Sequence, residues 1–170
     1  FTDVSPDSDY YKAVLWAVEQ GITSGVTKTA FAPDRVCTRA QAAVLLWRAE
    51  GSPAASGTHD FRDVAEGAYY ADAVRWAVSK GITCGTSATT FAPDMTVTRS
   101  QTVTFLYRAA GTPAVSGGSF ADVDANAYYA DAVAWAVAEG ITSGTSATTF
   151  SPNAPCTRAQ IVTFMYRDAQ

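Results

Sequence analysis

The stretch Tyr128-Tyr-Ala-Asp-Ala-Val-Ala-Trp-Ala-Val137 decides the fold, because the chain contains it three times in related forms. Residues 69–78 differ from it at one position, and residues 10–18 are a third version. The same motifs surround each copy in the same order, with Phe-x-Asp-Val before it and Gly-Ile-Thr, Phe-x-Pro and Thr-Arg-x-Gln after it. The 170 residues are therefore three copies of one unit, rather than the single domain that this length suggests.

Each unit is expected to fold as a helix, a loop and a second helix. In the first copy, apolar side chains recur at the spacing of one helical face, at Tyr11, Val14, Leu15 and Val18. Asp7, Ser8 or Asp9 can cap the start of this first helix, and Gly21 stands where a glycine ends a helix. The sequence therefore predicts an all-α fold.

The second helix of each unit has a sharper start signal. A threonine followed three residues later by a glutamine predicts a capping box, in which each side chain accepts a hydrogen bond from the backbone N–H of the other residue. The three pairs are Thr38–Gln41, Thr98–Gln101 and Thr157–Gln160. A glycine and a proline then end the helix, at Gly51 and Pro53 in the first unit.

A unit of two helices cannot bury its apolar stripe alone, so the three units must pack on one another. An open solenoid and a closed bundle with pseudo-threefold symmetry both satisfy this requirement. We favour the closed bundle, because no unit carries the polar outer face of a terminal repeat. Connectors rich in small residues separate the units, and they place the repeats at residues 1–56, 57–116 and 117–170.

Composition limits the classes of function. The 12 Lys and Arg residues against 16 Asp and Glu give a net charge of -4, which argues against broad binding of nucleic acid or of anionic membranes. No apolar run approaches the roughly 20 residues that span a bilayer, so no membrane insertion is expected. The charged fraction of 16% is low, as is common in extracellular proteins. The single histidine, His59, reads as a solvated linker residue, and with one histidine we expect no metal and no cofactor.

Taken together and in fixed order, the five repeated motifs resemble the S-layer homology (SLH) domain, in the three tandem copies that are this family's commonest arrangement. The resemblance covers essentially the whole chain. It implies a three-pronged module in which one helix from each repeat forms a central bundle. It also implies a non-catalytic, extracellular anchor that attaches exported proteins to a Gram-positive-type cell wall. The family's usual ligand is a peptidoglycan-linked secondary cell-wall polysaccharide with pyruvylated N-acetylmannosamine, held in grooves between adjacent repeats.

The arginine of each Thr-Arg-x-Gln motif is the strongest candidate for ligand binding. These residues, Arg39, Arg99 and Arg158, stand at the first helical position, beside unpaired backbone N–H groups that favour an anion. The carboxylate of a pyruvate ketal would suit this place, since a guanidinium binds carboxylates with two parallel donors. The simpler interpretation is that the arginines lie on the surface or pair with Asp34 or Asp94. For the glutamines Gln41, Gln101 and Gln160, capping alone is at least as good an account.

Other repeated residues are weaker candidates. The tryptophans Trp16, Trp76 and Trp135 could stack on sugar rings or simply pack in the core. The glycines Gly25, Gly85 and Gly144 could admit a sugar close to the backbone, or only allow a turn. Asp72 and Asp131 could bind sugar hydroxyls, and because Lys12 replaces them in the first repeat, the three grooves are expected to be chemically unequal.

Several other functions are less well supported. The same fold could bind another surface protein or self-assemble, which is the main alternative to glycan binding. A cell-wall hydrolase is disfavoured, because no carboxylate pair stands out. Calcium binding by Asp3, Asp63 and Asp122 lacks the alternating ligands of a calcium loop, so capping or turn formation is expected for them. A disulfide from Cys84 to Cys37 or Cys156 is conceivable, but free thiols are favoured. The chain also begins in mid-pattern at Phe1, so we expect it to be part of a larger surface protein.

Overall fold

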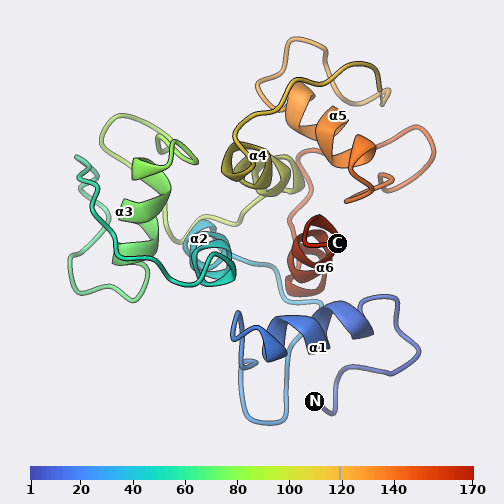
Figure 1. Ribbon diagram of the computed structural model, residues 1–170, viewed down its shortest axis with the longest axis horizontal. Coiled ribbons are helices and arrows are strands. Elements are labelled where there is room, and N and C mark those ends of the chain that lie inside the picture. The colour runs from blue at the N-terminus through green and yellow to red at the C-terminus, as the bar shows by residue number, and fades with distance from the viewer. Residues whose placement is uncertain (119) are drawn as a thin grey trace.

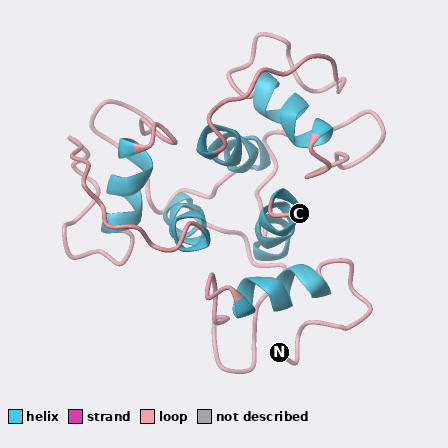
Figure 2. Cartoon of the chain, viewed as in Figure 1, coloured by secondary structure: helices cyan, strands magenta, loops and turns pink. Residues whose placement is uncertain are grey.

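The computed structural model describes residues 1–118 and 120–170. Its regular elements are six α-helices, two in each repeat, joined by long loops (Figures 1 and 2). The helices are α1 (Tyr11–Glu19), α2 (Arg39–Ala49), α3 (Ala71–Ser79), α4 (Arg99–Ala109), α5 (Ala130–Ala138) and α6 (Arg158–Asp168). Among the described residues only isolated backbone bridges supplement these helices, so the predicted all-α class is confirmed.

The three second helices, α2, α4 and α6, form the centre of the molecule, and the three first helices lie outside them (Figure 1). Each outer helix packs against the central helix of the neighbouring repeat, because α3 contacts α2 and α5 contacts α4. The first outer helix, α1, packs against the last central helix, α6. The chain is thus closed on itself, as the absence of a polar terminal repeat predicts.

The closure is completed by a ring of backbone hydrogen bonds between the three loops that lead into the central helices. Cys37 N–H donates to the carbonyl of Cys156, Cys156 N–H to that of Val97, and Val97 N–H to that of Cys37, each at 2.9 Å. The three residues are fully buried. They mark the pseudo-threefold axis, where each repeat donates one hydrogen bond of the ring to the repeat before it in the cyclic order.

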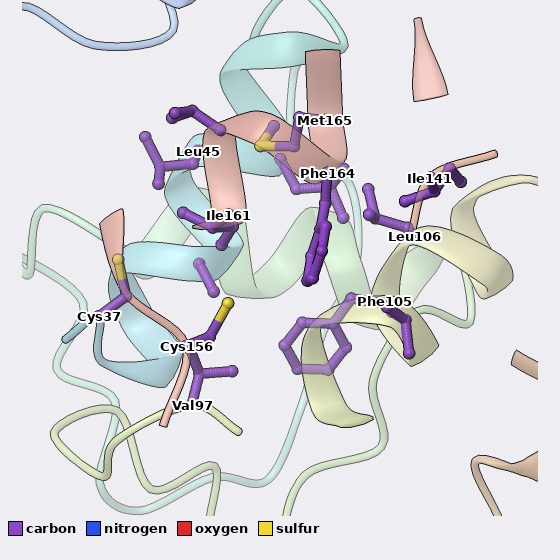
Figure 3. Packing of buried hydrophobic residues seen from close by; sticks show 14 of the residues in the cluster. Cys37, Leu45, Val97, Phe105, Leu106, Ile141, Cys156, Ile161, Phe164 and Met165 are labelled. Atoms are coloured by element: carbon purple, nitrogen blue, oxygen red, sulfur yellow. The ribbon is translucent and has the colours of Figure 1, made fainter. Parts of the chain in front are cut away.

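The apolar core occupies the space between the central helices and beneath the outer ones. Its largest fully buried side chains repeat with the units, at Phe31, Phe91 and Phe150 and at Ile22, Ile82 and Ile141. Figure 3 shows part of this cluster, with Phe105 from α4 and Phe164 from α6 filling the space between their helices. Because units share these contacts across their junctions, no unit has a complete core of its own.

The helix ends test the sequence expectations directly. All three capping boxes are present, with both reciprocal bonds formed in each. Gly21 follows α1 with a φ of +70°, as predicted for a glycine that ends a helix. The prediction of a side-chain cap at Asp7, Ser8 or Asp9 is wrong, because α1 starts after Tyr10 without one. Instead, the N–H of Tyr11 donates to the backbone carbonyl of Ser8, so a turn satisfies it.

Candidate functional site

The aspartate of each Phe-x-Asp-Val motif holds the distant loop that builds the site. The Asp3 carboxylate accepts hydrogen bonds from the backbone N–H of Phe31 at 2.9 Å and of Ala32 at 2.7 Å. Asp63 and Asp122 bind the equivalent loops in the same way. All three aspartates lie in turns, as expected, but their carboxylates cap no helix. Each joins two segments 28 residues apart, and the two N–H donors hold the pKa of Asp3 below its usual value.

The loop held by each aspartate receives the arginine of the neighbouring repeat. Arg39 donates from Nε to the carbonyl of Phe91 at 2.8 Å, and its guanidinium carbon lies 4.8 Å from the centre of the Phe91 ring. Arg99 and Arg158 make the same two contacts with Phe150 and Phe31. All three arginines stand at the first position of a central helix, as predicted.

These arginines are buried charges, which corrects the simpler sequence interpretation. Arg39 and Arg99 are each 4% exposed, so they do not lie on the surface. Neither Asp34 nor Asp94 pairs with an arginine, since within the described residues the one carboxylate–guanidinium pair closer than 4.0 Å is Arg75 with Asp72. Burial lowers the pKa of all three arginines. A guanidinium nevertheless stays protonated in proteins, so each repeat junction holds a buried positive charge with no carboxylate of the described residues within 4.0 Å of it.

We call the three places where these arginines lie junction A (Arg39), junction B (Arg99) and junction C (Arg158). Junction A contains a cavity of about 340 Å³ whose wall includes the loop Thr83–Thr86, Gln101, Thr104, Phe105, Arg108 and Tyr128. Junction B contains a cavity of about 250 Å³ whose wall includes the loop Thr142–Gly144, Gln160, Thr163, Phe164, Arg167 and Asp9. Each of these cavities is therefore lined by residues from all three repeats.

Two groups of predicted site residues do reach these cavities. Gln101 and Gln160 line them, but the capping box uses the oxygen of each side chain, so the amide nitrogen is what each can offer a ligand. Gly85 and Gly144 also line them, with φ of +85° and +91°. A Cβ at Gly85 would clash with the ring of Phe61, so packing alone requires a glycine there. The equivalent residues of junction C are Gln41 and Gly25.

The tryptophans and the outer-helix aspartates do not join the cavities. Trp76 and Trp135 are 4% exposed, and the ring of Trp135 lies 5.6 Å from that of Tyr107 on the facing central helix. Trp16 packs in the same way on Tyr166. The buried rings of Trp76 and Trp135 offer no free face to a sugar, whereas Trp16 is only partly buried and lines neither cavity. Asp72 and Asp131 are exposed on the outer helices and line neither cavity.

The sequence reasoning missed the second arginine of each central helix. Arg108 donates from an amino group to the carbonyl of Ile82 at 3.0 Å, and Arg167 does so to Ile141 at 3.1 Å. Arg48 makes the matching bond to Ile22 in the first repeat. Their recurrence at one position of each unit was the available signal. These bonds join the Gly-Ile-Thr loop to the end of the central helix. Arg108 and Arg167 also bring a second positive charge to the cavities of junctions A and B.

The sequence reasoning also missed the residues that stand at the mouths of junctions A and B, Tyr128 and Asp9. Tyr128 lies just before α5 in the third repeat, and Asp9 lies just before α1 in the first repeat. Each therefore comes from the repeat that supplies neither the arginine nor the Gly-Ile-Thr loop of its junction. Only the closed arrangement brings that helix to a junction between two other repeats, so no local pattern indicates it.

The cysteines are free thiols, as favoured from the sequence. Burial raises the pKa of Cys37 to about 12 and that of Cys156 to about 11. Cys84 is exposed and lines the cavity of junction A, and it forms no disulfide. Over the described ranges, no cluster of three or more His, Cys, Asp or Glu side chains gathers that could bind a metal ion. None of the helices there is long and apolar enough to cross a bilayer.

A larger hollow, of about 680 Å³, lies along α5 and contains none of the three junction arginines. Gly118 and Ala134 line it, at the positions that His59 and Arg75 occupy in the second repeat. There Arg75 donates hydrogen bonds to the carbonyls of Gly57 and Ala55. The hollow therefore arises because small side chains in the third repeat replace the larger ones of the second repeat. Since the hollow contains none of the buried arginines, we take the junctions as the candidate site.

Fold and site together define a closed, single-chain, three-repeat helical module with a buried arginine at every repeat junction. The chain belongs to the S-layer homology domain family, whose model matches residues 1–43, 60–103 and 119–162. It is similar to the Surface-layer 125 kDa protein of Lysinibacillus sphaericus, with 35% identity over 62% of this chain and 9% of that protein. It is also similar to an Endoglucanase of Bacillus sp. (strain KSM-635), with 33% identity over 64% of this chain and 11% of that enzyme.

The chain spans about a tenth of the length of these relatives. S-layer homology domains are known as non-catalytic modules that anchor S-layer proteins and surface enzymes to the cell wall, and this chain contains three of them. The similarity to the endoglucanase covers a small part of that enzyme, so it carries no catalytic assignment here.

Proposed function

We propose that this module binds a peptidoglycan-linked secondary cell-wall polysaccharide at its repeat junctions, through acidic sugars such as pyruvylated N-acetylmannosamine. The observation that carries the proposal is the buried arginine at each junction, which has no carboxylate from the described part of the chain within 4.0 Å. Burying a charge without a partner costs free energy, and three repeats keep this cost at the same place. An anionic ligand would offset it.

The chemistry of a junction suits a carboxylate attached to a sugar. In junction A, Arg39 spends its Nε on the Phe91 carbonyl, which fixes the plane of the guanidinium and leaves its amino groups for a bidentate contact. Two aromatic rings, Phe91 and Phe105, lie 4.8 and 5.6 Å from the guanidinium carbon and stabilise its charge. Hydroxyl and amide groups of the wall would bind the sugar.

Three junctions on one polymer chain raise the affinity beyond that of a single site. If a repeating glycan reaches more than one junction, avidity can exceed single-site affinity by about 10²–10⁴-fold. The acidic sequence is compatible with this function, because the useful positive charge is local to the junctions. We propose that the protein acts outside the cell, as part of a larger surface protein, and has no enzymatic activity of its own in this segment.

Sedimentation with purified wall sacculi tests the proposal. Replacing one of Arg39, Arg99 and Arg158 by alanine should weaken binding partially, and replacing all three should abolish it. Arg62→Ala removes an exposed arginine outside the junctions and should leave binding unchanged. Circular dichroism must show the native helix content for each variant, since the junction arginines also join repeats.

A competition assay on the unmodified protein is independent of variant folding. Soluble pyruvylated N-acetylmannosamine should release the protein from sacculi, and the sugar without pyruvate should not. Sacculi stripped of their polysaccharide should bind no protein. Undiminished binding to stripped sacculi would contradict the proposal and favour the alternative, an interaction with another surface protein or self-assembly.

A further inference from the structure

We infer that the junctions are unequal and that junction A is the principal site for an acidic sugar, with junction B weakened by Asp9. The inference rests on the proposed function, since it concerns the same ligand. All three junctions share the buried arginine, the Gly-Ile-Thr loop and the second arginine of the central helix. Their differences lie in the residues at the mouth and on the wall.

The residue at the mouth differs most in charge. Tyr128 lines the cavity of junction A and is 64% exposed, whereas Asp9 stands at the equivalent position of junction B and lines its cavity together with Tyr10. Asp9 therefore faces the same space as Arg99 and Arg167, and its negative charge opposes the entry of a carboxylate. Tyr128 presents instead a ring and a hydroxyl, which can contact a sugar face and its hydroxyl groups. No carboxylate from the described residues lines the cavity of junction A.

The wall formed by the central helix separates junction C from the other two. Junction A has Thr104 and Phe105 there, and junction B has Thr163 and Phe164 at the same positions. In junction C these positions hold Val44 and Leu45. The second aromatic ring beside the arginine and the neighbouring hydroxyl are therefore both missing from junction C.

The arginine of junction C also has an internal partner. One amino group of Arg158 donates to the hydroxyl of Thr23 at 3.4 Å, within the junction. A ligand carboxylate would have to compete with this bond for the guanidinium. Junction A thus combines two positive charges, a hydroxyl-bearing wall, an aromatic mouth and a cavity of about 340 Å³ against about 250 Å³ in junction B.

The chain offers a matched thiol reporter for each junction. Cys84 is exposed beside the arginine of junction A, and exposed serines, Ser143 and Ser24, occupy its place in junctions B and C. Three proteins are compared: the unmodified chain, Cys84→Ser with Ser143→Cys, and Cys84→Ser with Ser24→Cys. Cys37 and Cys156 stay silent in the native protein, because they are fully buried.

The experiment measures the rate of iodoacetamide alkylation by mass spectrometry against the concentration of the methyl glycoside of pyruvylated N-acetylmannosamine. Half-maximal protection of Cys84 should need about tenfold less sugar than protection of the Ser143→Cys reporter, the order expected from one nearby like charge. Protection of the Ser24→Cys reporter should also be weaker than that of Cys84.

An exchange of the mouth residues tests the cause. Asp9→Tyr should bring the junction B reporter close to the behaviour of Cys84, and Tyr128→Asp should weaken protection of Cys84 about tenfold. Both positions are exposed, so the fold should be kept, as circular dichroism can verify.

The outcomes separate this inference from the function on which it rests. Equal protection at all three reporters, or an Asp9→Tyr exchange without effect on junction B, would overturn the inference while the glycan function stands. If no reporter is protected and the unmodified chain binds neither the glycoside nor the wall polysaccharide, the proposed function itself fails.

Discussion

At the scale of single residues, the module depends on a relay of three contacts at each junction. Asp63 holds the backbone of Phe91 and Ala92, the Phe91 carbonyl accepts from Arg39, and Arg39 in turn lines the cavity. The aspartate therefore positions the arginine that we propose to bind the glycan, and it does not itself line the cavity. These contacts explain why an aspartate occurs at the same position in all three repeats of this chain.

The relay predicts a loss of stability in acid. The N–H donors hold the pKa of Asp3 and Asp122 below the usual value. A carboxylate whose pKa is lower in the folded state contributes stability that is present above the unfolded pKa of about 3.9 and disappears as the pH falls through the folded value. The urea concentration at the unfolding midpoint should therefore decrease as the pH is lowered from about 5 to about 2.

The control for this prediction is the set of variants Asp3→Asn, Asp63→Asn and Asp122→Asn. Each keeps one acceptor oxygen but no charge, so each should be less stable at pH 7 and lose less stability in acid. Asp168, whose pKa is raised by burial, acts in the opposite direction and should be replaced by Asn in all proteins compared. An acid transition unchanged by the triple replacement would show that the relay does not cause it.

At the scale of elements, the central and outer helices begin in different ways. The central helices start with full capping boxes, whereas the outer helices start from backbone turns without a side-chain cap. The sequence predicts the first kind, because both partners lie within three residues. It could not predict the contact of Asp3 with Phe31 or the place of Tyr128, because these depend on how distant segments meet.

The capping box predicts a measurable contribution from Thr157. Its hydroxyl accepts from the N–H of Gln160 at 3.2 Å, and Thr157→Ala should cost about 1 kcal/mol of unfolding free energy. Thr157→Ser keeps the acceptor and should cost at most a few tenths of that amount. Urea unfolding of the three proteins at pH 7 measures the difference. Equal losses for alanine and serine would assign the effect to the missing methyl group instead of the cap.

At the scale of the whole molecule, the closed arrangement is both the source of stability and the origin of the site. Each cavity draws on all three repeats, as Arg39, Gln101 and Tyr128 show for junction A. The family resemblance and the missing polar terminal repeat were enough to predict the closure. The residues at the mouth of each junction could not be predicted from it, because their contribution depends on the angle at which an outer helix meets its neighbours.

Closure also predicts that the repeats cannot be removed one at a time. Deleting residues 117–170 leaves α1 without α6, breaks the ring of Cys37, Val97 and Cys156, and removes Phe150 from Arg99. The remaining residues 1–116 should therefore lose cooperative unfolding, whereas an open solenoid of the same repeats would keep it with reduced stability. Thermal unfolding followed by circular dichroism compares the fragment with the full chain. Adding residues 117–170 as a separate chain should restore a cooperative transition, because it supplies every missing contact. A fragment that unfolds cooperatively alone would show that two repeats already contain a sufficient core.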